Sequence, residues 1–176
     1  MKQARIGAIT MNWRLLKAII ALPGTALVFV PGIILVVADG TNFSHQFATP
    51  DRFLFWLALL PAGAGLGLAV WTVKLFMTFG EGTPAPWDPP QILVIQGPYR
   101  YVRNPMITSA LLMLLAETML FQSWPLALWM GIFFAGNAIY FPLAEEKGLE
   151  KRFGEDYRIY KAHVPRWIPR RQPWQP

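Results

Sequence analysis

Most of the side chains that could carry out polar chemistry fall in two stretches that lie far apart in the sequence. They are Arg100, Arg103 and Asn104 in the first stretch, and the acidic pair Glu145-Glu146 in the second. A guanidinium can pair with a carboxylate or a phosphate, and a glutamate can accept hydrogen bonds from two neighbouring hydroxyl groups. These residue types indicate the binding of a polar, charged ligand if the fold brings the two stretches together.

The sequence also excludes several kinds of chemistry. It contains no cysteine, so it lacks a cysteine nucleophile, a disulfide framework and a thiolate metal site, and its two histidines, His45 and His163, cannot build a metal centre alone. The net charge of +6 could suggest nucleic acid, but the basic residues flank hydrophobic runs, a distribution typical of membrane orientation. We therefore expect neither a metal nor a nucleic acid as a partner.

The hydrophobic runs that must position these residues are long enough to cross a membrane. Hydrophobic residues make up 54% of the chain and charged residues only 15%, which is too apolar for an ordinary soluble domain. Residues 18–38 and 53–73 carry no charge, and at 1.5 Å per residue each run spans roughly 30 Å. The second can continue past Lys74 to residue 79, because a lysine near a helix end can extend to the interface.

A helical hairpin follows these two segments. Between Pro105 and Ala144 the single charge is Glu117, near the outer helix end, where we expect it to reach water at the interface. The run is interrupted at Gln122-Ser123-Trp124-Pro125, where a proline suits the first turn of a new helix. The predicted fold is an all-α membrane protein, a single domain over residues 1–176 with about four transmembrane helices and a cytoplasmic amphipathic C-terminal helix. The expected helices cover about 15–38, 53–79, 106–121 and 125–144, followed by the C-terminal helix at about 145–162.

The distribution of lysine and arginine predicts the orientation of the chain. These residues cluster in the N-terminal arm, in the 74–105 connection and after residue 144, whereas the 39–52 loop holds only Arg52. The positive-inside rule therefore places both termini and the 80–105 loop in the cytoplasm. Because the hairpin adds two crossings, the 80–105 loop and the segment from Glu145 onward are expected on the same face.

Glycine and proline interrupt both of the first two segments. Pro23-Gly24 and Pro31-Gly32 indicate either simple bending of the first helix or a broken helix that lines a cavity. The Gly63-x-x-x-Gly67 spacing in the second permits the close approach of another helix, either within the bundle or in a dimer.

The two segments expected in the cytoplasm carry further signals. Prolines between residues 84 and 90 forbid a helix there, and such a long loop is more often functional than a mere connector. At its end, Asn104 could cap the third helix, with Pro105 at the first position, or contact a ligand directly. Trp167, after the C-terminal helix, is placed as an interfacial anchor. That helix is amphipathic, since apolar residues recur at helical spacing at Leu149, Phe153, Tyr157 and Tyr160.

These features together resemble the isoprenylcysteine carboxyl methyltransferase and phospholipid methyltransferase family. The resemblance covers about residues 90–170 and rests on Gly97-Pro-Tyr-Arg-Tyr-Val-Arg103-Asn-Pro105, a hydrophobic hairpin, Glu145-Glu146, Leu149, Phe153-Gly154, Tyr157, Tyr160 and Val164-Pro165. It implies a membrane-embedded methyltransferase that uses S-adenosyl-L-methionine and is unrelated to the soluble Rossmann-type enzymes. Methyl transfer from a sulfonium needs no covalent intermediate on the protein, so no catalytic residue is singled out. Positioning of the reactants and exclusion of water would supply most of the acceleration.

The resemblance also implies which residues contact the cofactor. In the family these contacts fall on a short stretch before the turn, on a tyrosine, on an Arg-His-Pro-x-Tyr motif and on the first glutamate of an acidic pair. The matching residues are Gln91, Ile92, Leu93, Val94, Tyr99, Arg103, Asn104, Pro105, Met106, Ile107 and Glu145. Helical spacing adds Asn137, Tyr140 and Phe141 as candidates for substrate binding, because Asn137 and Phe141 share the helix face of Glu145.

The sequence departs from the family pattern at several positions. Asn104 replaces the usual histidine, Ile107 the usual tyrosine and Ser109 a common glycine. Backbone contacts to the cofactor can persist through such changes. Phe141 stands where the prenylcysteine-specific members have a substrate-contacting arginine, so a prenylcysteine carboxylate has no obvious partner here.

The predicted function is therefore methyl transfer to an amphiphilic or lipid-like acceptor that is taken from the bilayer. Two alternatives stay open: a methyltransferase for a small hydrophobic thiol or a phospholipid amine, and a non-catalytic membrane protein that retains the fold. The departures at Asn104, Ile107 and Ser109 are the reason for the second alternative. The sequence specifies neither the acceptor atom nor the oligomeric state.

Overall fold

The computed structural model describes Lys17, residues 20–80 and residues 90–175. Within these residues the protein is all-helical and contains no strand. The part of the proline-rich loop between residues 81 and 89 lies outside the described residues. In chain order the elements are the π-helix η1 (Ile20–Phe29), α2 (Val30–Ala38), α3 (Phe53–Phe79), the 3-10 helix η2 (Gly97–Arg100), α4 (Pro105–Phe121), α5 (Trp124–Tyr140), the π-helix η3 (Phe141–Glu145), α6 (Glu146–Phe153) and α7 (Glu155–His163).

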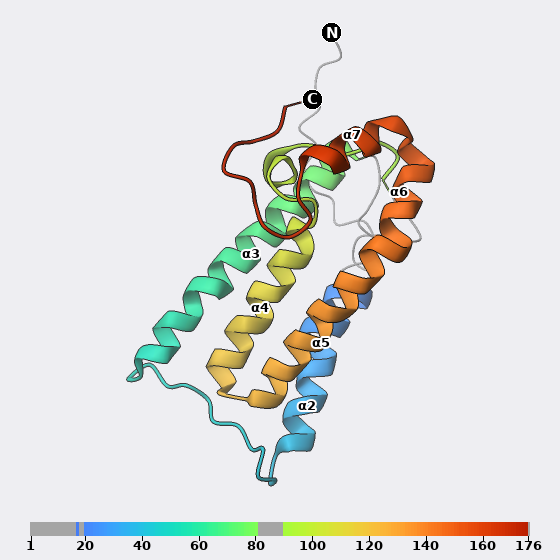
Figure 1. Cartoon of the computed structure of the whole chain (residues 1–176). Helices are drawn as coiled ribbons and strands as arrows, with labels where there is room; N and C mark the ends of the chain where they lie inside the picture. Colours follow the sequence, from blue (N-terminus) through green and yellow to red (C-terminus); the bar gives the residue numbers. More distant parts are fainter. Residues whose placement is uncertain (1–16, 18–19, 81–89, 176) are drawn as a thin grey trace.

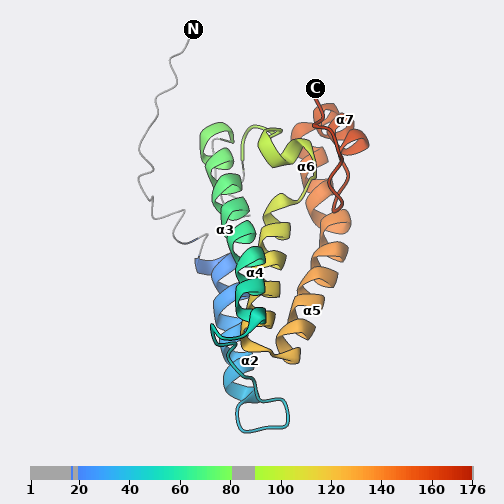
Figure 2. The same ribbon diagram turned by 90° about the vertical axis from the view of Figure 1, so that its left-hand side faces the viewer.

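Helices α3, α4 and α5 run side by side along the molecule, with α4 between the other two (Figures 1 and 2). The first helical segment packs on the same bundle, since η1 contacts α4 and α2 contacts α5. In this segment Pro31 has no backbone N–H, and the indole N–H of Trp129 on α5 donates to the Ala26 carbonyl at 3.0 Å. The segment therefore accommodates Pro23 within a π-helix, and a neighbouring helix supplies a hydrogen bond to its backbone.

Two of the helices are long and apolar enough to cross a membrane. They are α3, with 27 residues, and the continuous helix Trp124–Phe153, with 30 residues. Only 11% and 6% of their most apolar stretches are buried inside the protein. On α2 and α3, Val36, Phe53 and Leu60 are 77%, 78% and 68% exposed. Helices this apolar would be buried in the core of a soluble protein, so their open surfaces suit contact with lipid. The other apolar helices, Pro23–Ala38 and Pro105–Phe121, are shorter.

Gly65 allows α3 to pack tightly against α4. A Cβ atom added at Gly65 would lie 2.8 Å from the Met113 Cγ atom and 2.9 Å from the Ser109 carbonyl oxygen, which is too close for any side chain. Among the described residues, no atom lies within 4 Å of a Cβ added at Gly63 or Gly67. Within the chain, the close approach therefore occurs at the glycine between those two, and the dimer interpretation of the Gly63-x-x-x-Gly67 spacing stays a prediction.

The two ends of the bundle are built differently. At one end the 39–52 connection hydrogen-bonds to the last turn of α4, with the Ala48 N–H 2.7 Å from the Leu120 carbonyl oxygen. At the other end the segment from residue 90 to 104, the helices α6 and α7 and the C-terminal tail lie together (Figure 1). The hairpin of α4 and α5 thus returns the chain to the end where α3 finished.

The helix after the hairpin differs from the expected one in where it breaks. We expected a membrane helix ending at residue 144 and a separate helix over 145–162. Instead α5 continues through η3 into α6, and the break falls at Gly154, between α6 and α7. Gly154 has φ +57° and ψ −126°, a backbone conformation that residues other than glycine rarely adopt. The glycine therefore turns α7 back across the end of the bundle.

Candidate functional site

Backbone hydrogen bonds join the 90–104 segment to its neighbours at this end of the bundle. The N–H of Gln91 donates to the Gly80 carbonyl at 2.8 Å, so the chain returns to the end of α3. Further along, the Arg103 N–H donates to the Pro165 carbonyl at 2.9 Å. The Tyr160 hydroxyl on α7 donates to the Tyr99 carbonyl at 2.7 Å, and this bond is buried. The segment is thus held between α3 on one side and the C-terminal part of the chain on the other.

The turn that opens η2 depends on a glycine. Gly97 has φ +53°, and a Cβ atom there would lie 2.9 Å from the ring of Trp71 and 3.0 Å from the Leu75 side chain. Both the backbone conformation and the lack of space therefore require glycine. With Gly97 pressed against α3, the Tyr99 ring is buried between Leu75, Val94 and Phe76.

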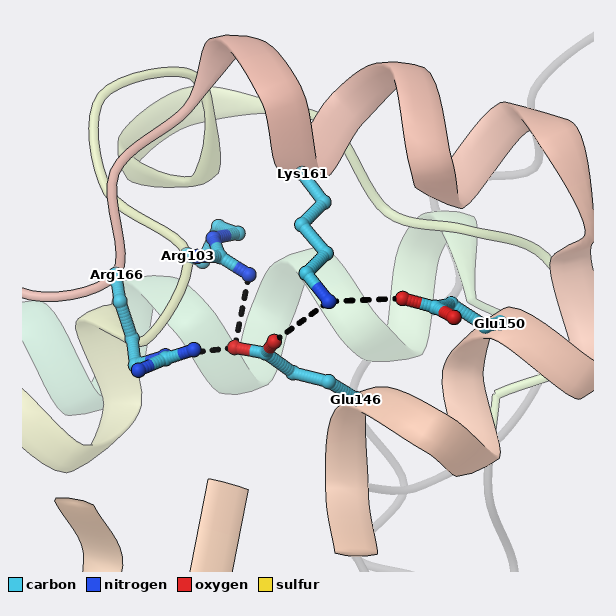
Figure 3. Close-up of polar contacts among 5 residues, drawn as sticks. All are labelled: Arg103, Glu146, Glu150, Lys161 and Arg166. Atoms are coloured by element: carbon cyan, nitrogen blue, oxygen red, sulfur yellow. Dashed lines mark hydrogen bonds and ion pairs between the residues drawn. The ribbon is translucent and has the colours of Figure 1, made fainter. Parts of the chain in front are cut away.

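Glu146 is the centre of a charged cluster at this end of the molecule (Figure 3). Its Oε1 atom accepts hydrogen bonds from Arg103 Nη1 at 2.8 Å and from Arg166 Nε at 2.6 Å. Its Oε2 atom lies 3.1 Å from Lys161 Nζ, which also donates to Glu150 Oε1 at 2.8 Å. One carboxylate therefore ties together the start of α4, α6, α7 and the tail that follows α7.

Two charged groups of this cluster are largely buried, which makes their pairing necessary. The Glu146 side chain is 2% exposed and that of Arg103 is 10% exposed, so both charges are largely removed from water. A buried charge is tolerated only when it is paired and hydrogen-bonded. Hydrogen bonds to Glu150 and Glu146 raise the pKa of Lys161. Burial raises the pKa of the neighbouring Tyr157 hydroxyl, although the nearby Arg103 guanidinium opposes this rise.

Pro142 explains why the second glutamate, and not the first, occupies the cluster. Proline lacks an N–H and disturbs the preceding helical turn, and residues 141–145 adopt a π-helical turn in which the Glu146 N–H donates to the Phe141 carbonyl five residues earlier. The wider turn places Glu146, rather than Glu145, below Phe141 on the helix. Glu145 is half-buried and interacts with Tyr140 and Arg152 instead. The spacing that placed Asn137, Phe141 and Glu145 on one face assumed an uninterrupted α-helix.

A surface pocket of about 590 Å³ lies next to the charged end. Three predicted cofactor residues, Gln91, Ile92 and Leu93, form one wall. Opposite them lie residues of α6, α7 and the tail, namely Phe153, Asp156, Ile159 and Trp174. The volume is within the range of small-molecule sites, and the lining combines apolar side chains with a few polar ones. The sequence reasoning missed Asp156 and Trp174, because only the reversal of the chain at Gly154 brings them opposite residues 91–93.

Just before the first turn of α4, two buried side-chain nitrogen atoms have no hydrogen-bond partner among the described residues. Asn104 is the N-terminal residue before α4 but makes no side-chain capping bond. Its Nδ2 atom is buried and has no hydrogen-bond partner in the described part of the chain, and the same holds for Arg103 Nε. Buried polar groups are nearly always hydrogen-bonded in native proteins, so unsatisfied donors call for an explanation. Of the two roles considered for Asn104, ligand contact fits this geometry and side-chain capping does not.

The other predicted residues of this turn have packing contacts. Pro105 is fully buried, and Met106 and Ile107 are partly buried. The carbonyl oxygen of Met106 accepts the Ser109 hydroxyl at 2.6 Å. Ser109 itself faces Gly65 at the contact with α3. The Ser109 side chain, which departs from the family glycine, is therefore satisfied within its own helix and makes no contact with the charged cluster among the described residues.

The predicted substrate residues follow the upper part of α5 toward the charged cluster. Asn137 donates to the Phe133 carbonyl at 2.7 Å, within its own helix. Tyr140 is 50% exposed on the outer surface, and Phe141 packs edge-on against Trp167 with ring centroids 5.9 Å apart. Trp167, expected as an interfacial anchor, also contacts Phe134 at 5.3 Å. The tail thus packs on the last turns of the apolar helix.

Glu117 lies away from this site. It is on the half of α4 that leads to Phe121, at the end where the 39–52 connection packs. Its Oε2 atom is buried without a partner among the described residues. Within the same residues, no group of three or more histidine, aspartate or glutamate side chains could hold a metal ion. The charged cluster and the adjacent pocket are therefore the features on which a functional interpretation rests.

The chain also matches a model of a known protein family. A family model described as phospholipid methyltransferase matches residues 53–156, more than half of the chain. The matched range begins with α3, contains the α4–α5 hairpin and ends just after Gly154. No curated protein matches the chain significantly.

Proposed function

Since the chain belongs to the phospholipid methyltransferase family, we propose that it transfers a methyl group from S-adenosyl-L-methionine to a lipid-like acceptor in the membrane. The observation that carries the proposal is the meeting of residues 91–104 with Glu146 and α7 at one end of an apolar hairpin. These are the two stretches on which the family resemblance places cofactor contacts. Their union in space supports a shared site.

The residues at this end fit the chemical groups of the cofactor. The unpartnered donors Arg103 Nε and Asn104 Nδ2 suit the carboxylate of the methionine part. Glu145, or Asp156 in the adjacent pocket, would accept the ribose hydroxyls. The apolar pocket wall, with Ile92 and Trp174, suits an adenine ring. When bound, the cofactor supplies an electrophilic methyl group on a positively charged sulfur.

The role of the protein in such a reaction is to hold and shield the reactants. Glu146 fixes the Arg103 side chain, and α7 and the tail cover the end of the hairpin. Ordered donors and a water-excluding site favour the attack of an acceptor on a sulfonium, which needs alignment more than acid–base assistance. An amine or another neutral nucleophile fits better than a prenylcysteine carboxylate, because Phe141 packs on Trp167 where an arginine would be needed.

We further propose that all four apolar segments cross the membrane, with both termini and the charged site in the cytoplasm. The first segment and α4 are short, but each lies against a longer apolar helix. The basic residues Arg103, Lys161 and Arg166 lie together at the end of the bundle that holds the charged cluster. The 39–52 connection, at the other end, carries Arg52 as its single lysine or arginine. This asymmetry is the one that the positive-inside rule associates with a cytoplasmic face.

Calorimetric titration of the purified protein with S-adenosylhomocysteine tests the proposal. The wild type should bind, and Asn104→Leu should weaken binding by about tenfold or more, since one charged hydrogen bond contributes roughly 1.5–3 kcal/mol. Glu155→Gln, on the exposed face of α7, is the matched control and should bind like the wild type. A wild type that shows no binding would instead support the non-catalytic alternative. A screen of phospholipid amines and hydrophobic thiols with a labelled methyl donor then identifies the acceptor class.

A further inference from the structure

An apolar groove of about 340 Å³ lies between α4 and α5 on the surface of the hairpin. Leu111, Leu112 and Leu115 of α4 form one wall, and Met130, Gly131 and Phe134 of α5 form the other. The one polar residue in the lining is Thr108, and its hydroxyl already donates to the Asn104 carbonyl at 3.1 Å. The groove therefore offers no free polar group, and burial of hydrocarbon is the interaction that can fill it favourably.

The groove leads to the charged site. The end of the groove nearer the charged site is at Thr108, one helical turn from Asn104 and its unpartnered Nδ2 atom. The segment 165–167 packs next to this end, because the Pro165 carbonyl accepts the Arg103 N–H and the Trp167 ring packs on Phe134. From Thr108 the groove runs about 10 Å along α4 to Leu115, toward the middle of the hairpin. A ligand lying in it would have one end among charges and the rest among leucines.

We infer that this groove holds a hydrocarbon chain of the methyl acceptor, with the head group directed to the cluster of Arg103 and Glu146. The inference rests on the proposed function and names its substrate class: an amphiphile with an aliphatic chain, rather than a small polar molecule. The groove is part of a surface that faces lipid, so such a chain can enter sideways from the bilayer. The walls between α4 and α5 then select the acceptor by its chain.

Gly131 is the residue that keeps the groove open. Nothing lies within 4 Å of a Cβ atom added at Gly131, so a larger side chain can be accommodated there and would project into the space of the groove. Gly136, on the same helix, is equally free of neighbours but does not line the groove. The two positions are separated by roughly 140° around the helix axis. Gly131→Leu and Gly136→Leu are therefore a matched pair, and both changes raise helix propensity.

The test uses a lysophosphatidylethanolamine with a diazirine on its acyl chain, added to the full-length protein in phosphatidylcholine nanodiscs. After illumination, mass spectrometry locates the labelled residues. We expect labelling concentrated on the α4 and α5 residues of the groove and reduced by excess unlabelled lysolipid. Gly131→Leu should lower this labelling about tenfold, equivalent to roughly two buried methylene groups. Gly136→Leu should leave it unchanged.

Two results would overturn the inference. One is labelling spread evenly over the outward surface of α3 and the hairpin, as for bulk lipid, and the other is equal groove labelling in Gly131→Leu and wild type. Titration with S-adenosylhomocysteine, run on the same samples, separates this failure from failure of the proposed function. If all three proteins bind the nucleoside but labelling is uniform, the groove assignment alone is wrong. If the wild type binds none, the acceptor role of the groove is rejected together with the methyltransferase assignment.

Discussion

Arg103 Nη1 donates a 2.8 Å hydrogen bond to Glu146 Oε1 across 43 positions of sequence, and both side chains are largely buried. This contact joins the first turn of α4 to the helix that leaves the hairpin, and Arg166 and Lys161 complete it from the tail and α7. Arg103 and Arg166 both donate to the same oxygen of Glu146. The cluster therefore holds the 90–104 segment, α6, α7 and the tail together.

Removing the Glu146 charge should therefore destabilise the protein strongly. Glu146→Gln leaves the buried Arg103 guanidinium without its counter-charge, which typically costs about 3–5 kcal/mol. Glu155→Gln breaks an ion pair with Arg158 in which the side chains are 70% and 64% exposed, and surface pairs contribute roughly 0–1 kcal/mol. Thermal unfolding in detergent should show a large drop in midpoint for the first variant and almost none for the second. Equal midpoints would mean that the cluster does not hold the fold.

Gly154 provides a second test, of the break between α6 and α7. Alanine at Gly154 would have to adopt φ +57° and ψ −126°, a strain of about 1–3 kcal/mol. Gly148 lies inside α6, and no atom lies within 4 Å of a Cβ added there, so Gly148→Ala should stabilise the helix by roughly 0.5–1 kcal/mol. Unfolding midpoints of the two alanine variants should therefore move in opposite directions. Movement in the same direction would contradict the chain reversal at Gly154.

The packing of α3 on α4 gives a third matched comparison. Gly65→Ala places a methyl group 2.8 Å from Met113 and 2.9 Å from the Ser109 carbonyl, and such overpacking costs about 1–3 kcal/mol. Gly63→Ala and Gly67→Ala meet nothing within 4 Å and should be neutral or slightly stabilising. Thermal midpoints of the three single variants measure the difference. A destabilised Gly63→Ala beside an unaffected Gly65→Ala would show that the helices pack in another register.

The raised pKa of Lys161 predicts how stability depends on alkaline pH. Glu150 and Glu146 hold Lys161 in its charged form in the folded protein, so its folded pKa lies above the unfolded value of 10.5. Its contribution is fully present below that pH and is lost as the pH rises through the folded pKa. Burial also raises the pKa of Tyr157 and Tyr160, whose ionisation in the unfolded chain weakens stability in the same range.

Lys161→Arg separates these contributions, because arginine stays charged and can keep both ion pairs. The unfolding temperature of the wild type should decrease as the pH is raised from about 9.5 to 11. In Lys161→Arg the fall should be smaller, since only the tyrosine part remains. Identical pH profiles for the two proteins would show that Lys161 is not held by its glutamates in the folded state.

The sequence predicted the helical segments and the meeting of the two polar stretches better than it predicted the contacts between them. Long uncharged runs indicate helices whatever their neighbours are, because length and apolarity alone decide the matter. The family resemblance likewise identified the stretches around Arg103 and the acidic pair. These parts of the prediction depended on local sequence. The all-helical fold of the described residues and the family membership agree with them.

The details that escaped prediction depend on small shifts in helix geometry. The π-turn at Pro142 rotates the helix so that Glu146 takes the position expected for Glu145, and no periodicity rule indicates how a helix accommodates a proline. Similarly, spacing suggested Gly63 and Gly67, whereas the orientation of α3 relative to α4 selects Gly65. The position of Asp156 in the pocket wall depends on the backbone of Gly154, which sets the direction of α7.

We propose that the cofactor binds where residues 91–104 meet Glu146 and α7. Ultraviolet cross-linking of tritiated S-adenosylmethionine to the purified protein, followed by peptide mapping, tests this binding site directly. We predict that the label is found in peptides covering residues 91–107 and 145–160, and that Asn104→Leu reduces it about tenfold, consistent with the loss of one charged hydrogen bond. Absence of labelling, or label confined to the 39–52 connection and the far end of α4, would show that the cofactor does not bind at this end of the bundle.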